Sequence, residues 1–276
     1  MLRILVKALA RRHRISHRER TRHLDRSSPP TTIRAMQLSV VVPAYNETHR
    51  IRGNVERIVD FLRSNFEAWE VIVVDDGSKV DAASALQGIE GIHCLRNEVN
   101  RGKGYCVRRG MLAARLHPIL FTDADLSTPI EDARKLWDAI EGGADVAIGS
   151  RLRDPVTRVR RTLHRRMMAL GFRLLVKLLA VRGFHDTQCG FKMFRRAPAR
   201  TIFSAQRLER WGFDVEVLWL ARRMGLHIAE VPVSYRESDE SRLSVWTPFT
   251  MTRDLLRIRW NILRGAYRSL VAPQET

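Results

Sequence analysis

The chain has 276 residues, of which 45% are hydrophobic, and this is enough for one α/β domain with a buried core. Its 48 Lys and Arg against 30 Asp and Glu give a formal charge of +18, which indicates an anionic partner such as a phosphorylated substrate, an acidic lipid or nucleic acid. The sequence has no helix-turn-helix, Cys/His finger or aromatic RNA-stacking motif, so nucleic acid is not the expected partner.

Two short segments carry most of the excess charge. Residues 1–36 hold ten Lys and Arg against two acids, and residues 151–182 hold ten against one. The first segment is interpreted as a basic, flexible N-terminal extension, because Arg3 and Lys7 interrupt its apolar stretch and no signal-peptide cleavage site follows. No run of about 20 uncharged apolar residues occurs, so no spanning helix is expected. The three cysteines lack metal-ligand spacing and favour a reducing compartment.

After this extension, strand and helix patterns alternate, which predicts a mostly parallel sheet flanked by helices. The first strand is expected at 38–43 and the first helix at 51–66, where apolar residues recur at helical spacing. Further strands are expected at 71–74, 92–95, 119–122 and 146–148. Ligands of such sheets bind beyond the carboxyl ends of the strands, so the polar segments there should form one site.

Two later stretches have the amphipathic character of interfacial helices. Residues 163–181 place Arg166, Arg173 and Lys177 on one stripe of an otherwise apolar helix. Residues 249–271 combine five arginines with Leu, Ile, Trp and Tyr. Each stretch is equally consistent with an ordinary helix packed on the domain.

The strongest chemical signal is Asp123-Ala124-Asp125, directly after the predicted strand at 119–122. Two carboxylates one residue apart at a strand end suit Mg²⁺ or Mn²⁺ that also binds diphosphate oxygens. A metal held there offsets the charge on a departing nucleoside diphosphate. Taken alone, the motif is weak, and a surface turn is its default explanation.

Other polar segments converge on the same predicted edge. Residues 43–47 (PAYNE) follow the first strand and residues 74–78 (VDDGS) the second, which places Asp76 to accept a hydrogen bond from a base and Tyr45 to lie against it. Helix N-capping explains each segment separately but not their common edge. The loop at 100–104 (NRGKG) offers backbone N–H groups and Lys103 to a phosphate, although a plain turn is equally consistent.

The segments VVPAYNE, VVDDGS, NRGKG, FTDADLS, AIGSR and DTQCGFK, in this order and at these distances, resemble the family 2 glycosyltransferases with the GT-A fold. The resemblance runs from about residue 38 to about residue 260. Residues 186–192 and 209–216 (ERWGFDVE) are more similar to the dolichyl-phosphate glucosyltransferase branch than to the mannose synthases.

The resemblance implies a binding role for each matching residue. Those expected to hold the nucleoside are Pro43, Tyr45, Glu47, Val74 and Asp76, and those expected to hold diphosphate and metal are Asp123, Ala124 and Asp125. Ser127 stands where mannose synthases present a Gln to the metal, and its shorter reach leaves water as the alternative ligand.

The resemblance also implies residues for the transfer step. Arg151 and Arg242 are expected to meet the pyrophosphate or the acceptor phosphate. Asp186, Asp214 and Glu216 are the remaining acids near the acceptor side, where transfer to a hydroxyl often needs a carboxylate base. A lipid phosphate, with a second pKa of about 6, is largely ionised at neutral pH and needs no strong base.

We therefore expect a basic extension (1–36), a GT-A α/β domain (37–240) and a C-terminal amphipathic helical segment (241–276). The expected activity is an inverting transfer of glucose from UDP-glucose to dolichyl or polyprenyl phosphate, with Mg²⁺ or Mn²⁺. The expected place is an anionic membrane surface, at its cytoplasmic face, with peripheral attachment.

Two alternatives stay open. One is another polyprenyl-phosphate sugar synthase that uses GDP-mannose or UDP-N-acetylglucosamine, and the other is a non-catalytic membrane- or nucleic-acid-binding module on this scaffold. A processive polysaccharide synthase fits less well, because Gln206 stands one residue too far from Arg210 and Trp211 for the motif of that class.

Overall fold

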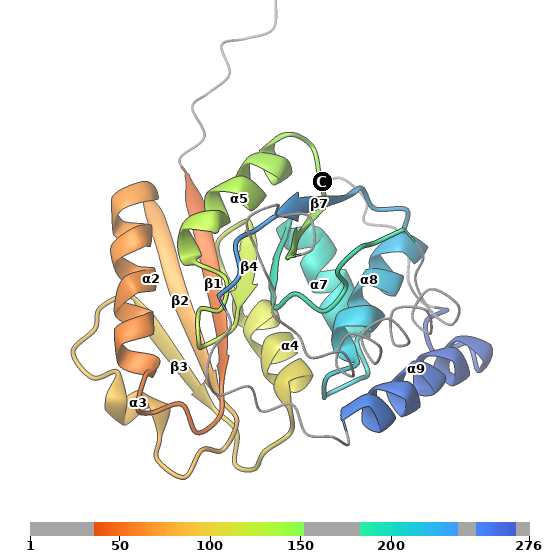
Figure 1. Ribbon diagram of the computed structural model, residues 1–276, viewed down its shortest axis with the longest axis horizontal. Helices are drawn as coiled ribbons and strands as arrows, with labels where there is room; N and C mark the ends of the chain where they lie inside the picture. The colour runs from red at the N-terminus through yellow and green to blue at the C-terminus, as the bar shows by residue number, and fades with distance from the viewer. Residues whose placement is uncertain (1–35, 152–182, 237–246, 269–276) are drawn as a thin grey trace, which may run out of the picture. The chain divides into compact units, whose positions relative to one another are not determined.

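The computed structural model of the chain describes residues 36–151, 183–236 and 247–268. Within these ranges seven strands form one sheet in the order β3-β2-β1-β4-β6-β5-β7 (Figure 1). The predicted helix at 163–181 and Arg242 lie outside the described residues. No helix in the described ranges is long and apolar enough to cross a membrane.

The first half of the sheet is parallel, as the alternation of strands and helices predicts. Its strands are β1 (Gln37–Ala44), β2 (Ala68–Asp75), β3 (Ile92–Arg96) and β4 (Ile119–Thr122). Here β1 pairs with β2 and β4, and β2 pairs with β3, all in parallel. Because parallel strands end at one edge, the polar segments that follow β1, β2 and β4 share that edge.

An antiparallel strand, β6 (Phe191–Phe194), was not predicted. It lies between β4 and β5 (Val146–Ser150) and runs antiparallel to both, while β7 (Ile228–Pro232) pairs with β5 in parallel. Since β6 runs the opposite way, it begins at the edge where β4 and β5 end. The segment just before β6 is thereby brought beside the Asp-x-Asp motif.

Helices cover both faces of the sheet, because the apolar side chains of the strands alternate between two cores. On one face the helices are α2 (Ile51–Asn65) and α5 (Ala133–Glu141), with Val40 and Val42 of β1 beneath them. On the other face, the side chain of Val41 packs in the second core. The helices that cover this face are α4 (Lys103–Ala113), α7 (Arg196–Ala205), α8 (Phe213–Arg223) and α9 (Thr247–Leu263). The short elements are α3 (Ala82–Ala85) and the 3₁₀ turn η1 (Ile130–Asp132).

Candidate active site

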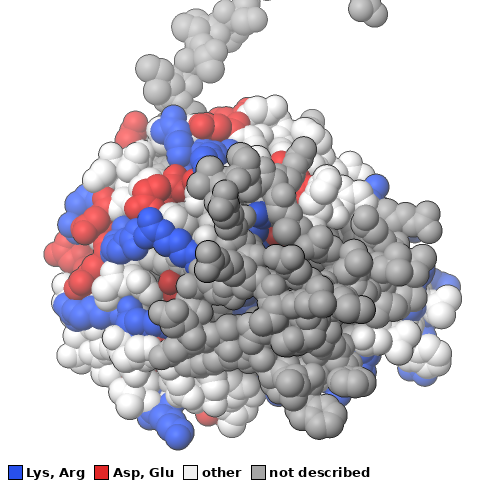
Figure 2. Space-filling view, viewed as in Figure 1, with Lys and Arg blue, Asp and Glu red and all other residues white. Residues whose placement is uncertain are grey.

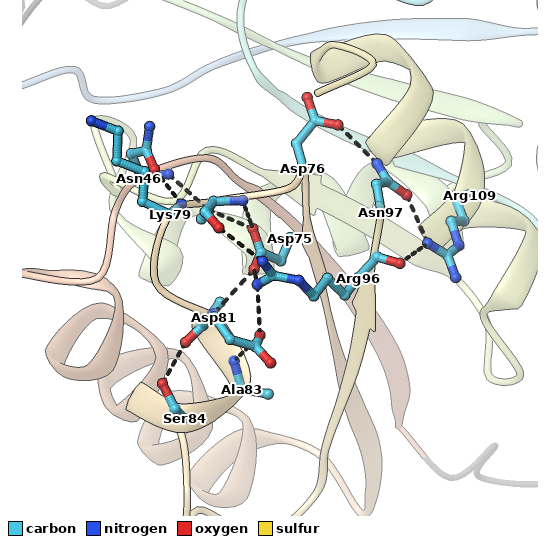
Figure 3. Close-up of polar contacts among 12 residues, drawn as sticks. Asn46, Asp75, Asp76, Lys79, Asp81, Ala83, Ser84, Arg96, Asn97 and Arg109 are labelled. Atoms are coloured by element: carbon cyan, nitrogen blue, oxygen red, sulfur yellow. Dashed lines mark hydrogen bonds and ion pairs between the residues drawn. The ribbon is translucent and has the colours of Figure 1, made fainter. Parts of the chain in front are cut away.

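The loop after β2 is organised by Asp75, a residue that the sequence did not single out (Figure 3). Its buried carboxylate accepts hydrogen bonds from the backbone N–H groups of Ser78 (2.9 Å) and Ala82 (3.1 Å) and from Arg96 Nη1 (2.8 Å). The Ser78 hydroxyl, which donates to the same carboxylate at 2.5 Å, accepts from the backbone N–H of Asn46 (2.8 Å). The loops that follow β1 and β2 are therefore joined.

The neighbouring carboxylate, Asp76, holds the loop that precedes α4. It accepts from Asn97 Nδ2 (2.8 Å) and from the backbone N–H groups of Arg101 (2.8 Å) and Gly102 (2.7 Å). Figure 3 shows its side chain pointing to Asn97, away from Asp75. The carboxylate expected to bind the base thus also holds the phosphate-loop candidate, and it sets where Lys103 leaves that loop.

The other predicted nucleoside residues lie at the same edge in different settings. Tyr45 is exposed, Pro43 is partly buried, and Glu47 forms an ion pair with Arg50. The side chain of Val74 is fully buried in the core on the α4 face of the sheet, so only its backbone can meet a ligand.

The carboxylate of Asp123, directly after β4, lies between the ammonium group of Lys103 and the backbone of Gly190. Lys103 Nζ forms an ion pair with its Oδ1. On the other side, a Cβ added at Gly190 would lie only 2.1 Å from its Oδ2, so the carboxylate packs directly on the glycine backbone. Burial opposes the charge of Lys103, but Asp123 and then Asp214 outweigh it and raise the pKa of the ammonium.

Asp214, the first-turn acid of α8, lies next to this pair and is fully enclosed. Its partner is Lys192 of β6, whose buried ammonium also donates to the Cys189 carbonyl at 2.5 Å. Burial raises the pKa of Asp214, although the ammonium groups of Lys192 and Lys103 oppose that shift. The buried ion pair of Lys192 and Asp214 therefore lies next to the partly exposed pair of Lys103 and Asp123.

Arg151, at the end of β5, forms a bidentate pair with Asp186. Its Nε and Nη2 donate at 2.7 and 2.9 Å, and its backbone N–H donates at 3.2 Å. Burial disfavours the charge of Asp186, but Arg151 outweighs it and lowers the pKa of the carboxyl. A carboxylate held in this way is a weak base, and its role here is to orient the guanidinium.

The segment at 186–192 therefore supplies three contacts of this region: Asp186 orients Arg151, Gly190 supports Asp123, and Lys192 neutralises Asp214. From the sequence, Asp186 was expected near the acceptor side, whereas Gly190 and Lys192 served only to mark a resemblance. The sequence offered one signal for the role of this segment: residues 186–192 contain two charged residues and a glycine, and they run into the mostly apolar stretch FKMF.

Glu216 does not join this group. Its buried carboxylate accepts from the backbone N–H of Leu208 (2.8 Å) and from the Tyr267 hydroxyl (2.5 Å), which ties α8 to the turn after α9. Burial raises the pKa of Glu216.

The donor set at the end of β4 fits a hard divalent cation that takes further oxygens from a ligand. Asp123 and Asp125 are both partly exposed, and Asp123 already carries a cationic partner in Lys103. Ala124 is buried, and its carbonyl accepts from Asn54 Nδ2 (2.8 Å). The backbone N–H of Ser127 donates to Asp125 Oδ1 (3.0 Å), so this serine shapes the turn of the motif. The described residues contain no cluster of three or more His, Cys, Asp or Glu, and two carboxylates leave room for diphosphate oxygens.

Known proteins resemble the chain over most of its length. The profile of the glycosyl transferase family 2 matches residues 39–203. A dolichyl-phosphate beta-glucosyltransferase of Drosophila melanogaster is 41% identical over 256 residues, which cover 85% of this chain and 78% of the relative. The enzymes with that name from Homo sapiens and Saccharomyces cerevisiae are 37% and 38% identical to this chain. Each alignment covers 84% of this chain, and it covers 78% of the human and 76% of the yeast enzyme.

Solved structures share the fold at low sequence identity. Mannosyl-3-phosphoglycerate synthase from Rubrobacter xylanophilus superposes with a TM-score of 0.62 at 20% identity, covering 87% of this chain and 77% of its own. Glucosyl-3-phosphoglycerate synthase from Mycobacterium tuberculosis, in complex with Mn²⁺, UDP-glucose and phosphoglyceric acid, gives 0.60 at 20% identity and covers 84% and 80%. The α/β fold expected from the sequence is confirmed.

Proposed function

The chain belongs to glycosyl transferase family 2 and is a glycosyltransferase, and on that premise we propose that it transfers glucose from UDP-glucose to dolichyl or another polyprenyl phosphate. The observation that carries the proposal is the pairing of Asp123 with Lys103 beside Asp125, at the sheet edge that the loops after β1 and β2 also reach. This edge offers carboxylates for a metal and cations for phosphate. The names of the relatives support glucose and dolichyl phosphate.

In this proposal, Asp123 and Asp125 hold a divalent cation, Mg²⁺ or Mn²⁺, which offsets charge on the departing nucleoside diphosphate. Lys103 is placed at the start of α4 by the loop that Asp76 holds, and it faces the same charge. Arg151, oriented by Asp186, faces the acceptor phosphate as an always-charged donor. Tyr45 lies against the base at the exposed end of β1.

The reaction is an in-line displacement at the anomeric carbon. An acceptor phosphate oxygen forms the new bond as the bond to UDP breaks, and the electron pair leaves on the diphosphate. No proton has to be removed from an acceptor phosphate that is already ionised. This matches a site in which Asp186 and Asp214 are each committed to an ion pair.

The proposal includes peripheral attachment at the cytoplasmic face of a membrane, because a polyprenyl phosphate resides in one. The formal charge of +18 supports an anionic surface as partner.

The test is transfer by the purified full chain from radiolabelled UDP-glucose, GDP-mannose and UDP-N-acetylglucosamine to polyprenyl phosphate. We expect UDP-glucose to react at least about tenfold faster than the others, and Asp125→Ala to lower the rate by about 10²-fold or more, as loss of a charge-stabilising group does. The matched control is Asp138→Ala on the exposed face of α5, which should keep the parental rate. Preference for GDP-mannose, or a parental rate in Asp125→Ala, would overturn the proposal.

A further inference from the structure

Helix α9 has an apolar stripe on each of two opposite sides. Its inner side packs on the core through Leu255 and Ile258. Its outer side exposes Leu256 (55%), Trp260 (53%) and Leu263 (76%). These three are spaced i, i+4 and i+7, so they form one stripe along the helix. An outer stripe of large apolar side chains is not needed to hold the fold.

Arginines flank this outer stripe on both sides. At 100° per residue, Arg253 and Arg257 lie on one side of it and Arg259 on the other, all of them exposed. Arg264 stacks on the Trp260 ring, with its guanidinium carbon 4.2 Å from the ring centre. The one acid between residues 247 and 268, Asp254, is buried on the inner side.

The described residues of α9 differ in charge from those of α2 and α3. Over α2 and α3, Lys and Arg alternate with Asp and Glu (Figure 2), whereas the described residues 252–268, which include most of α9, hold five arginines and the single acid Asp254. Exposed arginines beside exposed Leu and Trp complement a surface that is anionic outside and apolar beneath. A bilayer with acidic headgroups has this character.

We propose that the α9 outer face, made of Leu256, Trp260 and Leu263 with Arg253, Arg257 and Arg259, docks on the interface of an anionic bilayer. The leucines and the tryptophan enter the headgroup boundary, and the arginines meet lipid phosphates. This inference rests on the proposed function in one respect, that the acceptor is a membrane lipid.

Helix α9 is connected to the candidate site through a short loop. Asp254 Oδ2 accepts from the backbone N–H of Gly212 (3.2 Å), and a Cβ at Gly212 would lie 2.5 Å from the Asp254 Cβ, so helix and loop are in direct contact. The preceding residue, Trp211, is exposed, and Lys103 Nζ lies 5.5 Å from its ring centre. Lys103 in turn pairs with Asp123. Docking through α9 therefore brings the candidate site close to the lipid that it uses.

The test is flotation of the full chain with vesicles of phosphatidylcholine alone, or containing about 30% phosphatidylserine. We expect binding to the anionic vesicles only, a partition coefficient at least tenfold lower in Leu256→Ser/Trp260→Ser, and a weaker salt dependence in Arg253→Gln/Arg257→Gln. The matched controls are exposed residues of other elements, Val80→Ser and Arg63→Gln, and both should bind as the parent does.

Transfer assays separate docking from chemistry. With a short-chain, water-soluble polyprenyl phosphate, the α9 variants should keep the parental rate, and with acceptor embedded in vesicles they should lose at least tenfold. Vesicle binding that is unchanged in both α9 variants, equal binding to neutral vesicles, or a lost rate on the short-chain acceptor would overturn the inference. If docking depends on α9 but the parent transfers no glucose, the proposed function fails and the docking surface stands.

Discussion

Gly190 is the residue whose replacement most directly probes the support of Asp123. A Cβ at this position would meet Oδ2 of Asp123 at 2.1 Å and its Cγ at 2.6 Å, well inside van der Waals contact. The carboxylate would have to leave its place between the glycine backbone and Lys103. Glycine is required here by close approach and not by an unusual backbone conformation.

We therefore predict that Gly190→Ala lowers the transfer rate at least about tenfold at saturating donor and metal, equivalent to about 1.4 kcal/mol in the barrier. The control is Gly53→Ala in α2, where an added Cβ meets nothing within 4 Å. That change should leave the rate unaltered and stabilise the fold by about 0.5–1 kcal/mol. Steady-state kinetics and urea unfolding of both variants measure the two effects, and a parental rate in Gly190→Ala would show that Asp123 does not need this support.

At the residue scale, motifs predicted which side chains gather at the edge but not what each one contacts. Asp123 and Asp125 stand out because they follow a strand directly. The adjacent acids Asp75 and Asp76 cannot be told apart in the same way. Their separate partners, Arg96 for one and the backbone of Arg101 for the other, come from β3 and the loop after it. Only the tertiary fold assigns these contacts.

At the scale of elements, the pair between Arg151 and Asp186 joins the end of β5 to the segment before β6. Breaking a buried pair leaves one polar group without its partner, and we predict that Asp186→Asn lowers the free energy of unfolding at pH 7 by about 2–4 kcal/mol, toward the lower end for such pairs because Arg151 keeps some exposure. The exposed pair that Asp138 makes with Arg134 supplies the control, since Asp138→Asn should cost less than about 1 kcal/mol.

The difference in the free energy of unfolding between the parent and Asp186→Asn should depend on pH, and this dependence shows whether the Asp186 charge causes it. Because the pKa of Asp186 is lowered in the folded state, its stabilising effect is present above the unfolded value of about 3.9 and is lost as pH falls through the folded value. The difference between the parent and Asp186→Asn should therefore shrink below about pH 4 in urea titrations at each pH. A difference that stays constant from pH 7 to about pH 2.5 would exclude the carboxylate charge as its cause.

The parallel strands β1, β2 and β4 could be predicted closely, since each contains an apolar run that polar residues follow. The strand expected at 119–122 is observed with those bounds, and those expected at 38–43 and 71–74 extend to 37–44 and 68–75. Strand β6 could not be predicted in direction or place, because its neighbours β4 and β5 precede it in the chain and the pairing depends on tertiary packing. With β6 unknown, Gly190 and Lys192 had no visible connection to the site.

At the scale of the whole molecule, the proposed reaction requires the protein to bind two anions next to each other. A nucleoside diphosphate and a lipid phosphate repel each other, and a chain with a formal charge of +18 offsets that repulsion. Lys103 lies at the start of α4 and pairs with Asp123 after β4, Arg151 lies at the end of β5, and the arginines of α9 lie on its outer face. Cations near both reactants, rather than a strong base, are what a phosphate acceptor requires.

The linkage in the product shows whether the acceptor atom is a phosphate oxygen. The full chain is supplied with radiolabelled UDP-glucose and either polyprenyl phosphate or the matching free polyprenol, and the lipid product is treated with mild acid. We predict that a glucosylated lipid forms from polyprenyl phosphate and not from the free polyprenol. Mild acid should release its glucose, because a glycosyl phosphate linkage is cleaved under these conditions. An acid-stable product that forms equally well from the free polyprenol would show that the acceptor is an alcohol, and the proposal of a phosphate acceptor would be wrong.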